Sequence, residues 1–329
     1  MCVSNSQRPR DFREVLELIQ PDLEIVEHKL SDELRHESIL PAAQSVLQKP
    51  RLRVRSALHL LAGNLCECRG PAAVTIAFVI ELMQLASIVH SEIQSNTGRH
   101  VNGGTRTLSC SKARNILAGD WLWIECFVSA ITQRNYRVLA LLIAMGKATV
   151  ETQMIEASQN ERFGLRQAYR IYVRKAAQPI GICMQLAAVL ADRSSRVEAC
   201  MYRCGFHLGL ALQFATDLLA ITDSKPNSGS LIIEDQSVHN WSLPLVYALE
   251  RSTGQGQIVL MDVMRQKGLG ATSEELAFLV KESGGIEWAR SRANKHVLKY
   301  HEFLYSFPDS KFRRALHIFA ETIAAEANL

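Results

Sequence analysis

The chain has 329 residues, of which 47% are hydrophobic, enough to bury one large core or two smaller ones. Its formal net charge is only +4, from 37 basic and 33 acidic residues, and the sequence has no run of Lys and Arg with interleaved aromatic residues. This composition argues against a nucleic-acid partner. No stretch reaches the roughly 18 uninterrupted apolar residues that a membrane span requires, so none is expected.

The N-terminal segment carries no evident organelle-targeting signal, since acidic residues interrupt its arginines and an apolar region is missing. We expect residues 1–11 to be a flexible N-terminus and residues 12–329 to form one domain. The eight cysteines lie mostly within apolar helical sequence, where a free thiol behaves as a small hydrophobic group. We therefore expect reduced thiols and a cytoplasmic or other reducing compartment.

Apolar residues recur at three-to-four spacing along almost the whole chain, which predicts a helical protein. Residues typical of helix starts mark several boundaries, including Thr272 to Glu275 and Pro308 to Ser310. The strand-like run Leu231 to Ile233 is too short to anchor a sheet. In chain order, the expected helices cover residues 12–30, 43–62, 72–95, 112–131, 137–159, 167–191, 196–221, 243–250, 258–264, 273–282, 286–307 and 311–327.

The sequence has no repeat of 20–50 residues and no long, compositionally biased linker. One all-α domain is therefore expected. Helices that are long and apolar over wide faces indicate a bundle with buried central helices, which can enclose an apolar cavity.

Two of these helices become polar at their C-terminal ends, in the stretches "ASIVHSEIQSN" (86–96) and "QFATDLLAITD" (213–223). Helices of an antiparallel bundle can end at one mouth, and acids at i and i+4 share a helix face. Two opposed acidic faces would bind Mg²⁺ ions that bridge to a diphosphate. Such ions neutralise a leaving diphosphate while an apolar pocket shelters the carbocation. In this chain most of the acids that such a site needs are missing.

The sequence resembles the trans-isoprenyl diphosphate synthases, or polyprenyl synthetases, from about Phe12 to its end. The order and spacing of the matching stretches make this resemblance specific. It implies an isoprenoid-synthase-type helical bundle. The stretches are "RLRVRSALHLLAG", "IELMQLASIVH", "NILAGDWL", "YRIYVRKAA", "GFHLGLALQFATDLL", "SLPLVYALE" and "GGIEWARSRANKHVLKYHEFLYSFPDSKFRRAL".

The resemblance places the two metal-binding DDxxD motifs of the family on Ser91 to Ser95 and on Thr216 to Ala220. Only Glu92 survives in the first and only Asp217 in the second, so these two are the residual candidate metal ligands. Mg²⁺ would be the cofactor if the protein were active. Loss of even one well-placed electrostatic group typically costs on the order of 10²–10³ in rate, so ordinary chain elongation by this protein alone is not expected.

The same comparison assigns candidate diphosphate-binding residues. The arginines of the family that follow the first motif fall on His100 and Val101, which leaves only the adjacent Arg99. A family lysine falls on Leu52, and another on Asn240 or Trp241, so both are missing. The remaining candidates are Arg53, Arg55, Gln84, Arg99, Lys175 and Gln213. For Arg53, Arg55 and Lys175 the alternative is surface charge paired with Glu or Asp.

Two further features have an implied role and an ordinary alternative. Ala86 and Ser87 are small where bulky residues would block a growing prenyl chain in the family, so a tunnel could stay open; close helix packing explains them equally well. Cys200 and Cys204 resemble a CxxxC pair of some noncatalytic family subunits, although buried thiols would give the same spacing.

The resemblance implies a catalytically degenerate homologue that acts as the noncatalytic subunit of a heteromeric prenyl diphosphate synthase in isoprenoid biosynthesis. Its partner would be an active homologue, or a second copy of itself, with a prenyl diphosphate as a possible ligand. Two alternatives remain open at this point. One is an active but diverged prenyltransferase or terpene-synthase-like enzyme with atypical metal ligands, and the other is a prenyl-lipid-binding module.

Overall fold

The computed structural model describes residues 12–35, 53–95, 105–157, 164–222, 241–266 and 273–327. A few side chains at helix ends within these ranges, including that of Glu92, are outside the description. The described residues form helices joined by short connections and contain no β-strand. The expected single all-α domain is confirmed.

Where the connection between consecutive helices is described, it is a short turn. Their bounds are α1 Phe12–Glu17, α2 Gln20–Leu34, α4 Val54–Leu65, α5 Pro71–Ser95, α6 Thr105–Ile131, α7 Tyr136–Ala157, α8 Leu165–Tyr172, η3 Val173–Ala177, α9 Gln178–Leu190, α10 Ser195–Thr222, α11 Leu243–Arg251, α12 Gly254–Gln266, α13 Ser273–Glu282, α14 Gly285–Leu304 and α15 Lys311–Glu326.

Proline explains two differences from the expected helices. The first expected helix is divided into α1 and α2, and Pro21 lies at the start of α2. Proline suits that position because its missing N–H would have no helical partner there. The helix expected over residues 167–191 contains a π-helical turn, η3, just before Pro179. An α-helical turn would bring the proline ring against the carbonyl of Lys175, and a π-turn relieves that clash.

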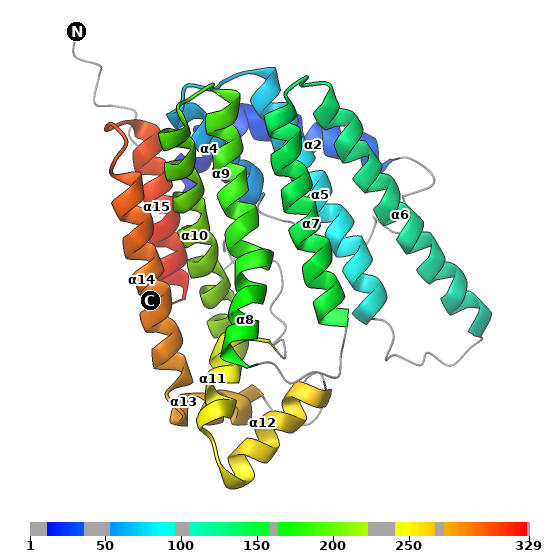
Figure 1. The fold of residues 1–329 in the computed structure, drawn as a ribbon, viewed down its shortest axis with the longest axis vertical. Coiled ribbons are helices and arrows are strands. Elements are labelled where there is room, and N and C mark those ends of the chain that lie inside the picture. Colours follow the sequence, from blue (N-terminus) through cyan, green and yellow to red (C-terminus); the bar gives the residue numbers. More distant parts are fainter. Residues whose placement is uncertain are drawn as a thin grey trace.

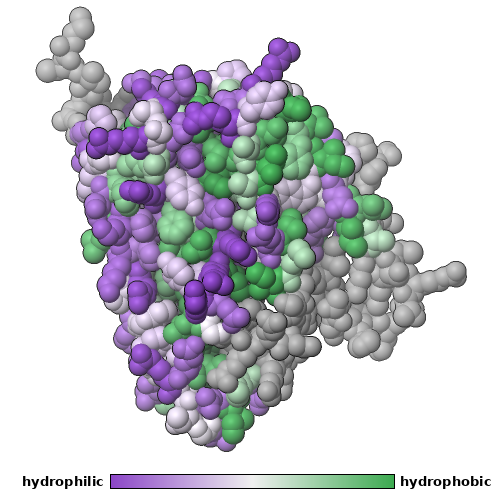
Figure 2. Space-filling model, in the orientation of Figure 1, coloured by the Kyte–Doolittle hydropathy of each residue, from purple (hydrophilic) through white to green (hydrophobic). Residues whose placement is uncertain are grey.

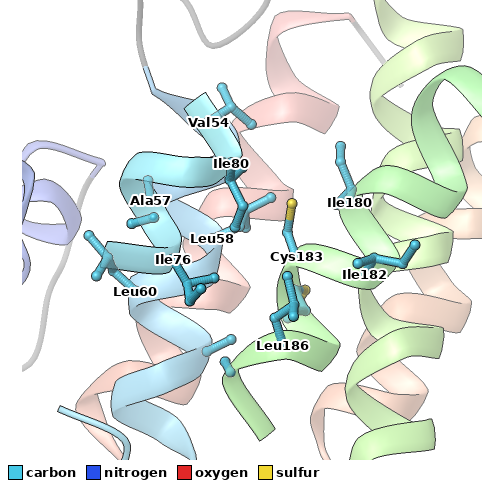
Figure 3. Close-up of a cluster of buried hydrophobic side chains, with 14 of the residues drawn as sticks. Val54, Ala57, Leu58, Leu60, Ile76, Ile80, Ile180, Ile182, Cys183 and Leu186 are labelled. Carbon is cyan, nitrogen blue, oxygen red and sulfur yellow. The ribbon is translucent and has the colours of Figure 1, made fainter. Parts of the chain in front are cut away.

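Helix α10 is central in the bundle and packs against α9 and α14, while α5 packs against α6 and α4 (Figure 1). Gly209 makes the close approach of α10 possible, because a Cβ there would lie 2.6 Å from the carbonyl oxygen of Ala176. Side chains of α4, α5 and α9 interlock in the core, where Leu58, Ile80 and Cys183 have no exposed surface (Figure 3).

Helices α5 and α10 both run towards the lower end of the molecule in Figure 1, whereas α14 runs the opposite way. The C-terminal ends of α5 and α10 are therefore at one end of the bundle, which we call the mouth. The turn between α14 and α15 is at the other end. The short helices α11, α12 and α13 lie below α10 and α14, beyond the mouth.

In the described part of the chain, three helices are long and apolar enough to cross a membrane by length and composition alone. The segments 71–91 and 195–222 are 72% and 67% buried in the bundle, but the segment 136–156 of α7 is only 33% buried. The six described cysteines are free thiols, of which Cys68 and Cys200 are half-buried and the other four are buried.

Candidate functional site

Asp217, a candidate metal ligand, lies near the end of α10 and is only 3% exposed. The Tyr172 hydroxyl donates a hydrogen bond to Oδ2 of Asp217, and Nε2 of Gln213 donates to Oδ1 at 2.9 Å. Tyr172 itself accepts a hydrogen bond from the backbone N–H of Leu243 at 3.0 Å. Both carboxylate oxygens of Asp217 are thus bound by protein groups, and Tyr172 links α10 to α8 and α11.

Burial raises the pKa of Tyr172 well above its usual value, and the charge of Asp217 acts in the same direction. The phenol therefore stays protonated and remains a donor to the carboxylate. Its ring packs edge-on against Phe214 and Trp241. This arrangement is typical of a structural carboxylate. The role of Asp217 as a metal ligand stays a prediction.

The candidate lysine, Lys175, is in η3, and its Nζ lies 2.9 Å from Oε1 of Glu156 on α7. The same ammonium lies 4.4 Å from the ring centroid of Trp241. The sequence comparison assigned a family lysine to position 240 or 241. At position 241 the structure has the Trp241 ring, which faces the Lys175 ammonium in a cation–π contact. A diphosphate would have to compete with Glu156 for Lys175.

The residues predicted to match the first motif are at the C-terminal end of α5. Ser91 is exposed, and its Oγ donates to the carbonyl oxygen of Ile88 in its own helix at 2.8 Å. Glu92 belongs to α5, but its side chain lies outside the described part, and Arg99 lies outside it altogether. Their roles as ligands stay predictions.

His90, just before this motif, is explained by its contacts with α6. Its Nε2 lies 3.3 Å from Oδ1 of Asp120 and 3.3 Å from the carbonyl oxygen of Ile116. Gly119 leaves the space for the ring, because a Cβ there would lie 2.1 Å from Nε2. Gly119 and Asp120 of the matching stretch "NILAGDWL" therefore have a packing role. Gly119 leaves space for the His90 ring, and Asp120 contacts it.

Arg53, before the start of α4, makes a bidentate ion pair with Glu27 of α2, at 2.6 Å from Nε to Oε1 and 3.2 Å from Nη2 to Oε2. Its Nη1 also lies 3.5 Å from Oε2 of Glu81 on α5. Glu81 is 3% exposed and accepts hydrogen bonds from both the N–H and the hydroxyl of Ser56. Arg53 is thus neutralised by two carboxylates.

The remaining predicted residues are on α4 and α5. Arg55 and Gln84 are half-buried. Ala86 has no exposed surface, and Ser87 accepts hydrogen bonds from Nε2 of Gln153, at 2.8 Å to its carbonyl oxygen and 3.1 Å to its hydroxyl. Ala86 and Ser87 thus lie where α5 meets its neighbours, and the tunnel stays a prediction.

Sequence reasoning did not identify the side chains that pair with Arg53, Lys175 and Asp217. Glu81 and Tyr172 are inside the matching stretches "IELMQLASIVH" and "YRIYVRKAA", so their position was a signal that could have been used. Glu27 and Glu156 lie outside every matching stretch, and only the fold brings them to Arg53 and Lys175.

Comparison with known proteins identifies relatives over most of the chain. The octaprenyl diphosphate synthase of Haemophilus influenzae is 20% identical over 92% of this chain and 93% of its own. Component 2 of the heptaprenyl diphosphate synthase of Bacillus subtilis is 23% identical over 95% and 90%. Among solved structures, a decaprenyl diphosphate synthase from Rhodobacter capsulatus superposes with a TM-score of 0.80 at 18% identity, over 96% of this chain and 99% of that one. The polyprenyl synthetase family model matches residues 36–281, and the chain therefore belongs to the polyprenyl synthetase family.

Proposed function

We propose that this chain is a catalytically degenerate polyprenyl synthetase homologue, the noncatalytic subunit of a heteromeric trans-prenyl diphosphate synthase in isoprenoid biosynthesis. One observation carries the proposal. Three of the charged groups left at family site positions are engaged by the protein itself: Arg53 by Glu27 and Glu81, Lys175 by Glu156, and Asp217 by Tyr172 and Gln213.

Ionisation of an allylic diphosphate needs positive charge that is free to bind the leaving group, and oxygen ligands that hold Mg²⁺. Ser91 and Thr216, which replace family acids, use their hydroxyls to donate to carbonyl oxygens of their own helices. Lys175 and Arg53 would each have to leave a carboxylate before binding a phosphate. The reaction would therefore lose its electrostatic stabilisation at several points at once.

An exposed apolar face on α6 and α7 supports a protein partner. On α6, Leu117, Ile124, Val128 and Ile131 are between 52% and 68% exposed, and their spacing places them on one side of the helix. On α7, Ile143, Val150 and Met154 are between 42% and 68% exposed at the same spacing.

Figure 2 shows hydrophobic surface over the side of the molecule where these helices lie. Contiguous apolar surface of this kind is typical of a protein interface. The Bacillus relative is named as one component of a synthase. We propose that this face binds an active homologue, or a second copy of this chain.

Co-expression with a DDxxD-bearing homologue tests the proposal. We expect a complex whose activity or product length differs from that of the homologue alone. The double substitution Ile124→Lys and Ile131→Lys should abolish the complex by burying charge in the interface. Leu298→Lys on α14 is the matched control, because Leu298 is 68% exposed but belongs to another helix; it should leave the complex intact.

Two results would overturn the proposal. One is that no homologue binds the chain and none changes in activity. The other is single-turnover conversion of an allylic diphosphate by the isolated chain with Mg²⁺, abolished by Glu92→Gln. That second result would make the protein a diverged enzyme with atypical ligands. Unaltered isoprenoid that co-purifies with the chain would instead point to a lipid-binding module.

A further inference from the structure

A cluster of potential metal ligands lies between α14 and α15, at the end of the bundle opposite the mouth (Figure 1). His301 is one turn before the end of α14, and His317 and Glu321 are one turn apart on α15. One ligand atom from each of the three residues lies within 4.8 Å of the other two. The side chain of His301 is 13% exposed and that of Glu321 is 54% exposed, so the cluster has one buried side and one side open to solvent.

The separations fit a tetrahedral metal ion. His301 Nε2 lies 3.1 Å from His317 Nδ1 and 3.4 Å from Oε1 of Glu321. Ligand atoms bound tetrahedrally at about 2.0–2.1 Å from zinc are about 3.3 Å apart. A small displacement of the side chains would therefore place all three atoms around one ion.

Several polar groups compete for the same two imidazole nitrogens in this cluster. His301 Nε2 faces a nitrogen of His317 and an oxygen of Glu321, and it carries at most one hydrogen, so it cannot donate well to both. The Tyr305 hydroxyl lies 3.1 Å from the same Nδ1 of His317. A cation that accepts all three lone pairs would satisfy both imidazoles and the carboxylate together.

We propose that His301, His317 and Glu321 form a binding site for Zn²⁺ or a similar borderline divalent cation. Two imidazoles and one carboxylate suit zinc, whereas Mg²⁺ prefers oxygen ligands. With three protein ligands, a water molecule takes the fourth position, on the open side. The ion ties α14 to α15 close to their turn, where the Tyr300 hydroxyl already donates to the carbonyl oxygen of Leu316 at 2.8 Å.

Zn²⁺ titration of the untagged full-length chain, followed by calorimetry, tests this site. We expect one Zn²⁺ per chain with micromolar or tighter affinity, unaffected by millimolar Mg²⁺, and a melting temperature that rises with Zn²⁺ concentration. Loss of an outer-shell partner of a metal ligand typically weakens metal binding roughly 10–100-fold. His317→Ala removes a ligand itself and should therefore weaken Zn²⁺ binding by more than that. Glu321→Gln keeps the side-chain size, removes the charge, and should weaken binding at least about tenfold.

His28→Asn is the matched control. His28 also has an acid one turn away, with Nδ1 2.9 Å from Oδ2 of Asp32, but it has no second imidazole in that pair. This variant should bind Zn²⁺ like the wild type. Substitution by Co²⁺ adds a spectroscopic measurement, because a tetrahedral site gives strong visible absorption that His317→Ala should abolish.

Failure to bind Zn²⁺ would overturn the inference, as would binding that persists unchanged in both His317→Ala and Glu321→Gln. Neither result bears on the proposed subunit function, since the site is at the opposite end of the bundle and involves no residue of the mouth.

Discussion

Tyr172→Phe tests whether Asp217 is a structural carboxylate. The substitution keeps the ring, and with it the edge-on packing against Phe214 and Trp241, and removes only the hydroxyl. That hydroxyl donates to Asp217 and accepts a hydrogen bond from the N–H of Leu243. Its loss therefore weakens the support of a buried carboxylate and leaves a backbone donor unpaired.

The expected cost follows from these two contacts. A hydrogen bond to a charged group contributes about 1.5–3 kcal/mol, and an unsatisfied buried donor costs about 1–3 kcal/mol. We therefore expect Tyr172→Phe to lower the free energy of unfolding by about 3–5 kcal/mol. This is a large share of the roughly 5–15 kcal/mol that stabilises a typical domain.

Urea unfolding of the wild type, Tyr172→Phe, Asp217→Asn and the double variant measures the effect. Because the two side chains touch, we expect a coupling energy of at least about 1 kcal/mol, in the absence of Mg²⁺. A loss below about 0.5 kcal/mol, or additive effects of the two substitutions, would refute the structural role. So would a coupling that arises only when Mg²⁺ and a diphosphate are present.

Three further predictions concern residues outside this network. Burial lowers the pKa of His59 from its usual 6.5 to about 4. Between about pH 4 and 6.5, the unfolded chain therefore binds a proton at His59 that the folded protein does not bind. Stability from this residue is complete above pH 6.5 and falls by about 3 kcal/mol as the pH drops towards 4. Urea unfolding between these pH values should show a flatter dependence for His59→Asn, and equal slopes would contradict this. Gly119→Ala should cost about 1–3 kcal/mol in thermal unfolding, because the new Cβ meets the His90 ring; His90→Ala in the same chain should restore most of it, and no recovery would point to a backbone effect. A hydrogen bond from the Cys204 thiol lowers the pKa of Cys200 to about 6, whereas burial raises that of Cys183 to about 12. Mass spectrometry after iodoacetamide treatment at pH 7 should find Cys200 labelled and Cys183 unlabelled, and equal labelling would contradict this.

The helices of the bundle were largely predictable because their apolar periodicity is strong. The expected helix over 72–95 is observed as α5, and that over 196–221 as α10, each within one residue at either end. The division between α1 and α2 and the π-turn before Pro179 were not predicted, although both depend on a proline visible in the sequence. Apolar periodicity indicates which residues face the core, but it does not indicate where a helix changes locally from α to π.

The sequence indicates which helices carry the candidate site residues, and it does not indicate what those residues contact. The resemblance placed Lys175, Gln213 and Asp217 on the helices that lead to the mouth, and the structure brings Gln213 and Asp217 together through a hydrogen bond of 2.9 Å. The ion pair of Lys175 could not be predicted, because Glu156 is 19 residues away along the chain and on another helix. A charged residue in a motif indicates which charge is present, and only the fold shows whether that charge is already neutralised.

This distinction decides which substitutions could create a diphosphate site at the mouth. Restoring acids at Ser91 and Thr216 would add negative charge to the mouth but would leave Lys175 paired with Glu156. A bound diphosphate must replace that carboxylate, which is 17% exposed and therefore partly shielded from solvent, so its attraction to the ammonium is weakened less than that of a surface pair. Under the proposed function, the mouth departs from a diphosphate site in two independent ways, through missing metal ligands and through cations that already pair with carboxylates. Reversal of either one alone would leave the other in place, and this is why we assign the chain a role beside an active partner.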